Sequence, residues 1–119
     1  MKENELTQRL FKFAVRTIKF QKVLPNSSDV KIIRYQLIKS SSSSGANYEE
    51  SQAGSSQADF TNKVRISLRE MRESNYWLRL IREVADKEYN TKELEWLINE
   101  SEELKKILGS IVQKSNIKK

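Results

Sequence analysis

The 119-residue sequence contains neither cysteine nor histidine. The absence of cysteine excludes a disulfide framework, a thiolate zinc site and a cysteine nucleophile. The absence of histidine removes the commonest general base and the commonest transition-metal ligand. We therefore expect a protein that is not an enzyme and that has no metal site and no cofactor.

Long apolar runs are also missing. No run approaches the roughly 20 residues that a helix needs to cross a bilayer. Residues Met1–Glu5 are too polar and too acidic to begin a secretory signal. These features predict a cytoplasmic protein without a membrane partner.

Glycine and proline are scarce, with three glycines and one proline in the chain. So few helix breakers favour long helices over a strand-rich fold. Helical periodicity covers residues 5–24, 27–52, 57–86 and 91–114, with short connections between them. Because short connections join antiparallel neighbours, residues 1–119 are predicted to form one all-α domain, an antiparallel up-down-up-down four-helix bundle. We expect residues 115–119 to fray.

Five consecutive serines, Ser40–Ser44, precede Gly45 and resemble a linker. However, one helical face continues through them at spacings of three and four, and it consists of Val30, Ile33, Leu37, Ser41, Ser44 and Tyr48. A serine hydroxyl can also bond to a carbonyl within its own helix. We expect the serines to lie inside the second helix, and a flexible loop is the alternative.

Two rows of basic residues are candidates for binding nucleic acid, in a chain with a net charge of +6. The first helix carries Arg9, Lys12, Arg16 and Lys19 with no acids between them, and the third carries Arg65, Arg69, Arg72, Tyr76 and Arg79. Such rows can bind phosphates, and the aromatic ring can stack on a base. The alternative is ordinary pairing within the third helix, such as Arg69 with Glu73 and Arg79 with Glu83.

Paired carboxylates invite comparison with dimetal helix bundles. The sequence contains Glu70-x-x-Glu73 and the pair Glu49-Glu50. Dimetal bundles complete their sites with Glu-x-x-His pairs, which a chain without histidine cannot supply. We interpret these carboxylates as parts of a solvated or salt-bridged helix surface.

Several apolar residues lie off the core rows of their helices. The candidates for a subunit interface are Phe11, Val15, Ile66, Trp77, Ile81 and Trp96. A monomer exposing most of them would carry an unusually large apolar patch, so we expect self-association. The alternative is that some of them fill gaps between helices.

Two segments resemble a known family, the bacterial four-helix bundle proteins first noticed as products of intervening sequences in 23S rRNA genes. Residues 37–50 match a Ser-Ile-(Gly or Pro)-Ala-Asn segment followed by acids, and residues 66–80 match the Ala-x-Lys-Glu-Ala-x-Glu and Tyr-Trp-Leu-x-Leu patterns. Ser44 stands where the family usually has isoleucine, and Arg69 stands at a lysine position. Because serine is smaller than isoleucine, Ser44 is expected to leave the core less filled at that position.

The resemblance implies a four-helix bundle that assembles into a ring, specifically a pentamer. The related accessory variability proteins of diversity-generating retroelements form such barrels, whose basic surface contacts nucleic acid and a reverse transcriptase. Our leading hypothesis is therefore a non-catalytic oligomer that binds RNA or DNA weakly and largely without sequence preference. The alternative is a protein-interaction scaffold whose basic face binds an acidic protein and no nucleic acid.

Overall fold

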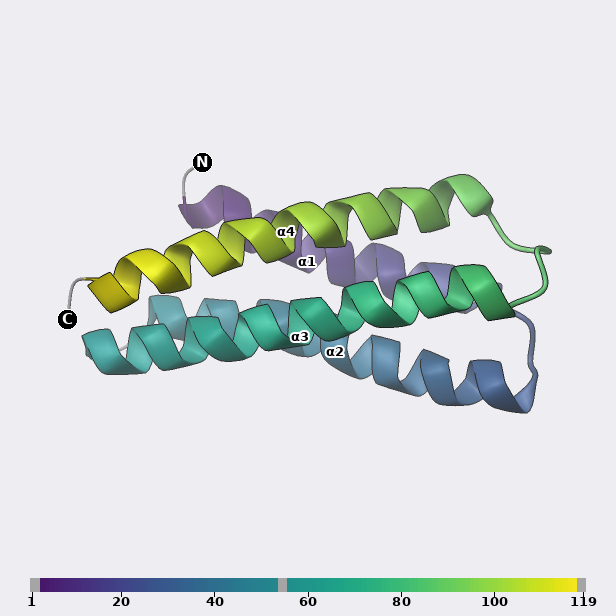
Figure 1. The fold of residues 1–119 in the computed structure, drawn as a ribbon, viewed down its shortest axis with the longest axis horizontal. Coiled ribbons are helices and arrows are strands. Elements are labelled where there is room, and N and C mark those ends of the chain that lie inside the picture. Colours follow the sequence, from purple (N-terminus) through teal and green to yellow (C-terminus); the bar gives the residue numbers. More distant parts are fainter. Residues whose placement is uncertain (1–2, 54–55, 118–119) are drawn as a thin grey trace.

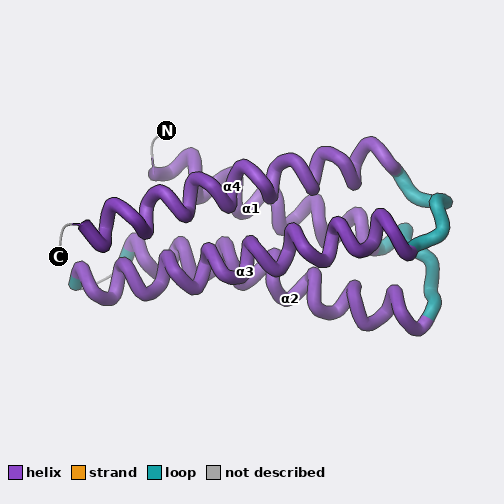
Figure 2. The backbone as a smooth tube through the Cα atoms, in the orientation of Figure 1, coloured by secondary structure: helices purple, strands orange, loops and turns teal. Residues whose placement is uncertain are grey.

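Four α-helices account for nearly all of the chain in the computed structural model, which describes residues 3–53 and 56–117. The helices are α1 (Glu3–Gln21), α2 (Ser28–Gln52), α3 (Gln57–Val84) and α4 (Thr91–Ile117). The α1–α2 and α3–α4 connections lie at one end of the molecule, and both termini lie at the other (Figures 1 and 2). The predicted all-α, up-down-up-down arrangement is confirmed.

The helices form an elongated bundle measuring 47 × 25 × 20 Å. Contacts are most extensive between α2 and α3 and between α3 and α4, whereas α1 packs more sparsely against α2 and α4. Within the described ranges, the diagonal pairs α1–α3 and α2–α4 do not come into close backbone contact. None of the described helices is long and apolar enough to span a membrane.

Short polar residues cap the N-termini of α3 and α4. The Ser56 hydroxyl accepts the backbone N–H of Asp59 at 3.0 Å, and Asn90 Oδ1 accepts that of Glu93 at 3.0 Å. These side chains satisfy N–H groups that have no partner within the helix. Arg34 secures the α1–α2 connection, because its Nη2 donates to the backbone oxygen of Leu24 at 3.0 Å.

The C-terminal part of α4 differs from the expectation that it would fray. Ser115 is 4% exposed. Its hydroxyl bonds to the Thr61 hydroxyl and accepts a hydrogen bond from the amide of Gln57. These contacts with α3 hold the last turns in place, so α4 continues to Ile117. Residues 118–119 lie outside the described ranges.

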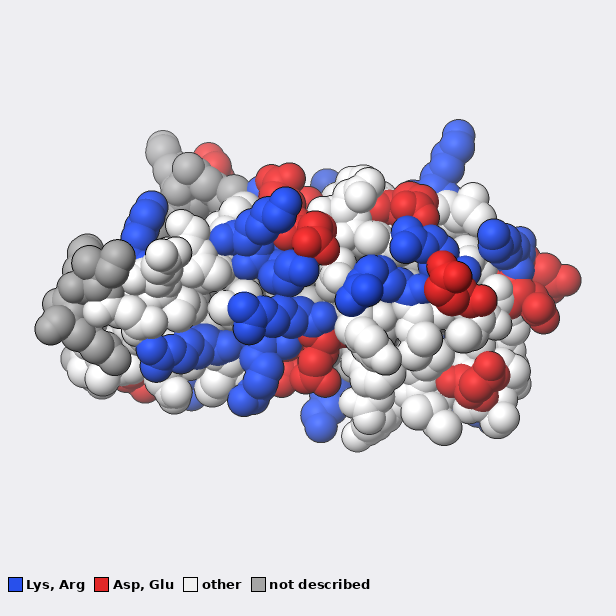
Figure 3. Space-filling view, viewed as in Figure 1, with Lys and Arg blue, Asp and Glu red and all other residues white. Residues whose placement is uncertain are grey.

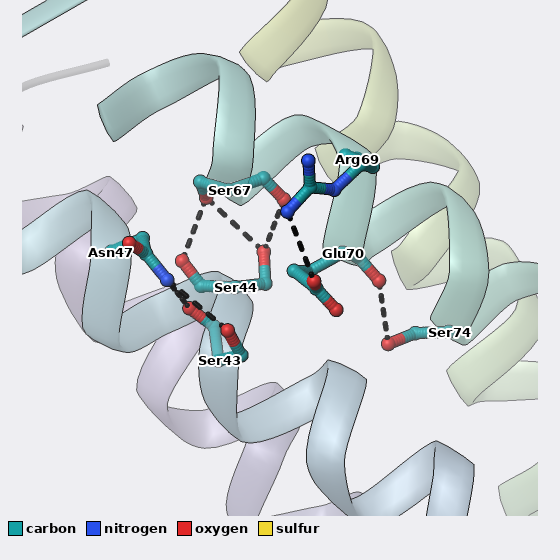
Figure 4. A network of polar contacts seen from close by, with 7 residues as sticks. All are labelled: Ser43, Ser44, Asn47, Ser67, Arg69, Glu70 and Ser74. Atoms are coloured by element: carbon teal, nitrogen blue, oxygen red, sulfur yellow. Dashed lines mark hydrogen bonds and ion pairs between the residues drawn. The ribbon is translucent and has the colours of Figure 1, made fainter. Parts of the chain in front are cut away.

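The serine run lies inside α2, as predicted. Ser40, Ser41 and Ser44 are buried, and Ser40 Oγ lies 2.8 Å from Ser74 Oγ of α3. Ser44 Oγ donates to the carbonyl of Ser67 at 2.8 Å, and Ser67 Oγ donates to that of Ser44 at 2.7 Å (Figure 4). Small residues on both helices allow this approach, so the core at Ser44 contains a polar pair.

One residue predicted at a subunit interface belongs to the core of the bundle instead. Ile81 is completely buried, together with Leu78 of the same helix. The prediction that Ile81 lies at an interface is therefore wrong. A helix that packed against one neighbour would bury a narrow row, but α3 packs against both α2 and α4, so its buried surface is wide enough to include Ile81.

Candidate nucleic-acid interface

Two of the four basic residues on α1 are paired with acids on α4. Arg9 makes a bidentate contact with Glu100, Nε–Oε2 at 3.0 Å and Nη2–Oε1 at 2.7 Å, and its Nη2 also lies 3.0 Å from Glu103. Arg16 makes a second bidentate contact, with Nε 2.8 Å from Glu93 Oε2. No acid lies between the members of the α1 row, but α4 supplies acids to Arg9 and Arg16.

These pairs shift the pKa values of Arg9, Arg16 and Glu93. The hydrogen bond from Arg16 lowers the pKa of Glu93 and opposes the effect of its partial burial. The carboxylate of Glu100 raises the pKa of Arg9 through the same kind of bond. The charges of Arg9 and Arg16 are thus compensated within the subunit, where the two side chains attach α1 to α4. A role for Arg9 and Arg16 in binding nucleic acid stays a prediction.

Trp96 takes part in the same contact between α1 and α4. The guanidinium carbon of Arg16 lies 3.4 Å from the ring centroid of Trp96, and Lys12 Nζ lies 6.0 Å from it. Trp96 also packs against the core, as does Trp77 of α3. Both tryptophans are half-buried within a single subunit. On α1, Lys12 and Lys19 remain exposed.

The α3 row borders a hollow of about 600 Å³ between α3 and α4. Its lining consists of Arg72, Asn75, Tyr76 and Arg79 from α3 and Lys105, Lys106 and Gly109 from α4. Figure 3 shows basic side chains gathered across the middle of the face that α3 and α4 present. The structure thus brings three of the predicted residues, Arg72, Tyr76 and Arg79, together in one site.

Few acids compensate the charge of the hollow. Lys105 Nζ lies 3.0 Å from Glu102, a contact that lowers the pKa of that carboxyl. Arg79 Nε donates to the neutral amide oxygen of Asn75 at 2.9 Å. For Arg72 and Lys106, the described part of the chain supplies no ion pair. The hollow therefore retains a net positive charge.

Tyr76 presents an aromatic surface at the hollow. Its side chain is 51% exposed. The guanidinium carbon of Arg79 lies 5.8 Å from the ring centroid. The ring of Trp77 contacts Tyr76 edge-on, at a centroid distance of 5.2 Å and an angle of 78°. These neighbours hold the ring in place while leaving half of it accessible.

Arg65 and Arg69 belong to the same helical row but lie outside the hollow. Arg65 Nη2 donates to the amide oxygen of Asn116 near the end of α4. Arg69 lies 3.7 Å from Glu70 (Figure 4), where the sequence analysis considered a pair with Glu73. Burial and repulsion from Glu73 raise the pKa of Glu70.

Sequence reasoning missed four residues of the hollow, Asn75 on α3 and the three that α4 contributes, Lys105, Lys106 and Gly109. Each helix was considered separately, whereas this site forms where two helices meet. A weak signal was present, because Lys105-Lys106 is a pair of adjacent cations followed by a glycine three positions later. Only the packing of α4 against α3 shows that these residues face Arg72 and Tyr76.

A second hollow, of about 690 Å³, lies between α1 and α2 and is mainly apolar. Phe11, 63% exposed, and half-buried Val15 line it, with Glu49 and Glu50 also at its edge. Both apolar residues were predicted to lie at a subunit interface, and this groove brings them together. Ile66, predicted with them, is half-buried on α3 and does not line the groove.

The segment that resembles the family motif has a packing role in this structure. Gly45 lies against α1, where an added Cβ would lie 3.5 Å from Leu10 Cβ. The side-chain amide of Asn47 donates to the backbone oxygen of Ser43 at 2.9 Å (Figure 4).

Among the residues described, no group of three or more Asp or Glu side chains is placed to hold a metal ion.

Comparison with known proteins gives the family of the chain. Residues 2–110 match the family model described as 23S rRNA-intervening sequence protein. A crystal structure from Bacteroides thetaiotaomicron, described as a protein with unknown function from the S23 ribosomal protein family, is 34% identical, with a TM-score of 0.78. The match covers 90% of this chain and 97% of that one. No curated protein matches. With the family model covering most of its length, the chain belongs to the 23S rRNA-intervening sequence protein family.

Proposed function

We propose that this protein is a non-catalytic accessory factor that binds RNA or DNA through phosphates, weakly and largely without sequence preference. The observation that carries the proposal is the hollow between α3 and α4, which is lined by four cations and one exposed aromatic ring. Contacts to phosphates carry no sequence information directly. The surface therefore fits binding that depends on charge more than on sequence.

We further propose that the protein assembles with copies of itself into a ring. The apolar groove between α1 and α2 supports this, because Phe11 is largely exposed there. Glu49 and Glu50 also line the groove. A ring would place several basic hollows on one particle, so that weak sites act together through effective concentration. The number five comes only from the family resemblance.

A salt titration tests the nucleic-acid proposal against the alternative, a scaffold that binds an acidic protein. Binding of several unrelated RNAs would be measured by fluorescence anisotropy over a range of salt concentrations. Neutralising several phosphates should give similar affinities for all of them and a steep, linear fall of log affinity with log salt concentration. Undetectable binding at low salt would contradict the proposal and favour the scaffold.

A further inference from the structure

Gly109 lies inside α4, where glycine is less favourable than alanine. A Cβ added at Gly109 would meet no atom within 4 Å, so packing within this chain does not require glycine. Gly45 is different, because there an added Cβ would contact Leu10 of the neighbouring helix. Gly109 lines the basic hollow. The missing side chain leaves room for an external group to approach the α4 backbone closely.

The charges around this space fit a phosphate. Arg72 and Lys106 line the hollow and have no ion pair among the residues described. A guanidinium and an ammonium both donate charge-assisted hydrogen bonds to phosphate oxygens. The volume of about 600 Å³ is within the range typical of small-ligand sites. The hollow can therefore hold a phosphate together with part of the nucleotide that carries it.

Tyr76 indicates whether that nucleotide belongs to a single strand or to a duplex. Its half-exposed ring lines the same hollow and is held in place by Arg79 and Trp77. An aromatic ring stacks on the face of an unpaired base, whereas base faces inside a duplex are covered by their neighbours. A duplex could use the cations of the hollow but could not use this ring.

We propose that the hollow binds a single-stranded segment of nucleic acid, with one phosphate close to Gly109 between Arg72 and Lys106 and the adjoining base stacked on Tyr76. The inference rests on the proposed function and deepens it by specifying the strand state of the ligand. Gly109 and Tyr76 are positioned to favour single strands, and the cations contribute affinity for any phosphate backbone.

Fluorescence anisotropy at low salt tests this inference with a labelled single-stranded oligonucleotide and its duplex. Single strands should bind more tightly than the duplex, and Tyr76→Ala should weaken single-strand binding about tenfold, as expected for one lost stacking contact. Gly109→Ala should raise the melting temperature of the free protein and yet weaken single-strand binding. Gly109→Leu should weaken it further. Ser110→Ala, a similar change at an exposed neighbouring position outside the hollow, should leave binding unchanged.

Three outcomes would overturn the inference. Equal affinity for single strand and duplex, with no effect of Tyr76→Ala, would reject it while leaving general phosphate binding intact. Full binding by a stabilised Gly109→Leu protein would show that nothing approaches α4 at that position. Absence of binding to either nucleic acid at low salt would reject the proposed function together with this inference.

Discussion

Ser44 and Ser67 face each other across the contact between α2 and α3, and each hydroxyl donates to the other residue's carbonyl. A single Ser→Ala change at either position should lower the free energy of unfolding by about 1 kcal/mol, the usual net value of such a bond. The loss of unfolding free energy in the double variant should differ from the sum of the losses in the two single variants, because the two bonds share a site.

A double-mutant cycle read by denaturant unfolding measures this coupling. Ser42→Ala is the matched control, because Ser42 is exposed and its hydroxyl bonds only within its own helix. Strict additivity of Ser44→Ala and Ser67→Ala would contradict a reciprocal pair.

Glu93 makes the stability of the folded protein depend on pH. Its pKa is lowered in the folded protein by the hydrogen bond from Arg16. The stabilisation is therefore fully present above the unfolded pKa of about 4.3 and is lost as pH falls through the lower folded pKa. Glu93→Gln should reduce stability by about 1–2 kcal/mol at neutral pH and flatten the acid limb of the stability curve.

Thermal unfolding measured between neutral and acid pH checks this prediction. Glu88→Gln provides the control, because Glu88 is an exposed carboxylate in the α3–α4 connection with no ion pair in the described part of the chain. If Glu93→Gln and Glu88→Gln had identical pH profiles, the bond to Arg16 would not contribute to folding.

At the scale of the elements, α2 is a continuous helix through its five serines. Ser41→Pro should destabilise the protein by about 3 kcal/mol or more, because proline removes a helix hydrogen bond and clashes with the preceding turn. Ser28→Pro should be tolerated, since Ser28 is the first residue of α2 and Ser27 before it is already extended. Melting temperatures of the two variants test this directly, and a silent Ser41→Pro would defeat the continuous helix.

The helices and most of their core residues could be predicted from sequence, because helical periodicity is a local property, although Ile81 on α3 was not. The face through Ser41 and Ser44 returns to Tyr48 at helical spacing, and that sufficed to place the serines in a helix. Contacts between helices could not be predicted in the same way. Arg9 and Glu100 are 91 positions apart, and only the rotation and relative height of α1 and α4 bring them together.

In the candidate site, too, residues on one helix could be predicted from sequence, whereas residues brought in by a second helix could not. Arg72, Tyr76 and Arg79 were identified because they follow one helix face, whereas Lys105 and Gly109 were not, because they approach from α4. Likewise, the α1 row looked uncompensated until α4 supplied the acids for Arg9 and Arg16. A row of charged residues on one helix can therefore be interpreted as a free surface only after the charges on the neighbouring helix have been taken into account.

At the scale of the whole molecule, Phe11 tests self-association. Phe11→Glu should shift the mass measured by light scattering at micromolar concentration toward that of a monomer, because it places a charge in the apolar groove beside Glu49 and Glu50. Val84→Ser removes an exposed apolar side chain at the far end of α3 and should leave the mass unchanged. A monomeric mass for the unaltered protein would contradict the ring.

The central claim is that the hollow between α3 and α4 binds nucleic acid, and the salt dependence of binding tests it most directly. The double variant Arg72→Gln/Lys106→Gln should lower affinity for single-stranded RNA and reduce the log–log salt slope by about 1.4 per site, the value expected for two lost phosphate contacts. Lys31→Gln/Lys87→Gln removes the same charge from exposed positions outside the hollow and should change the slope little. Equal slopes for the two double variants would contradict the account.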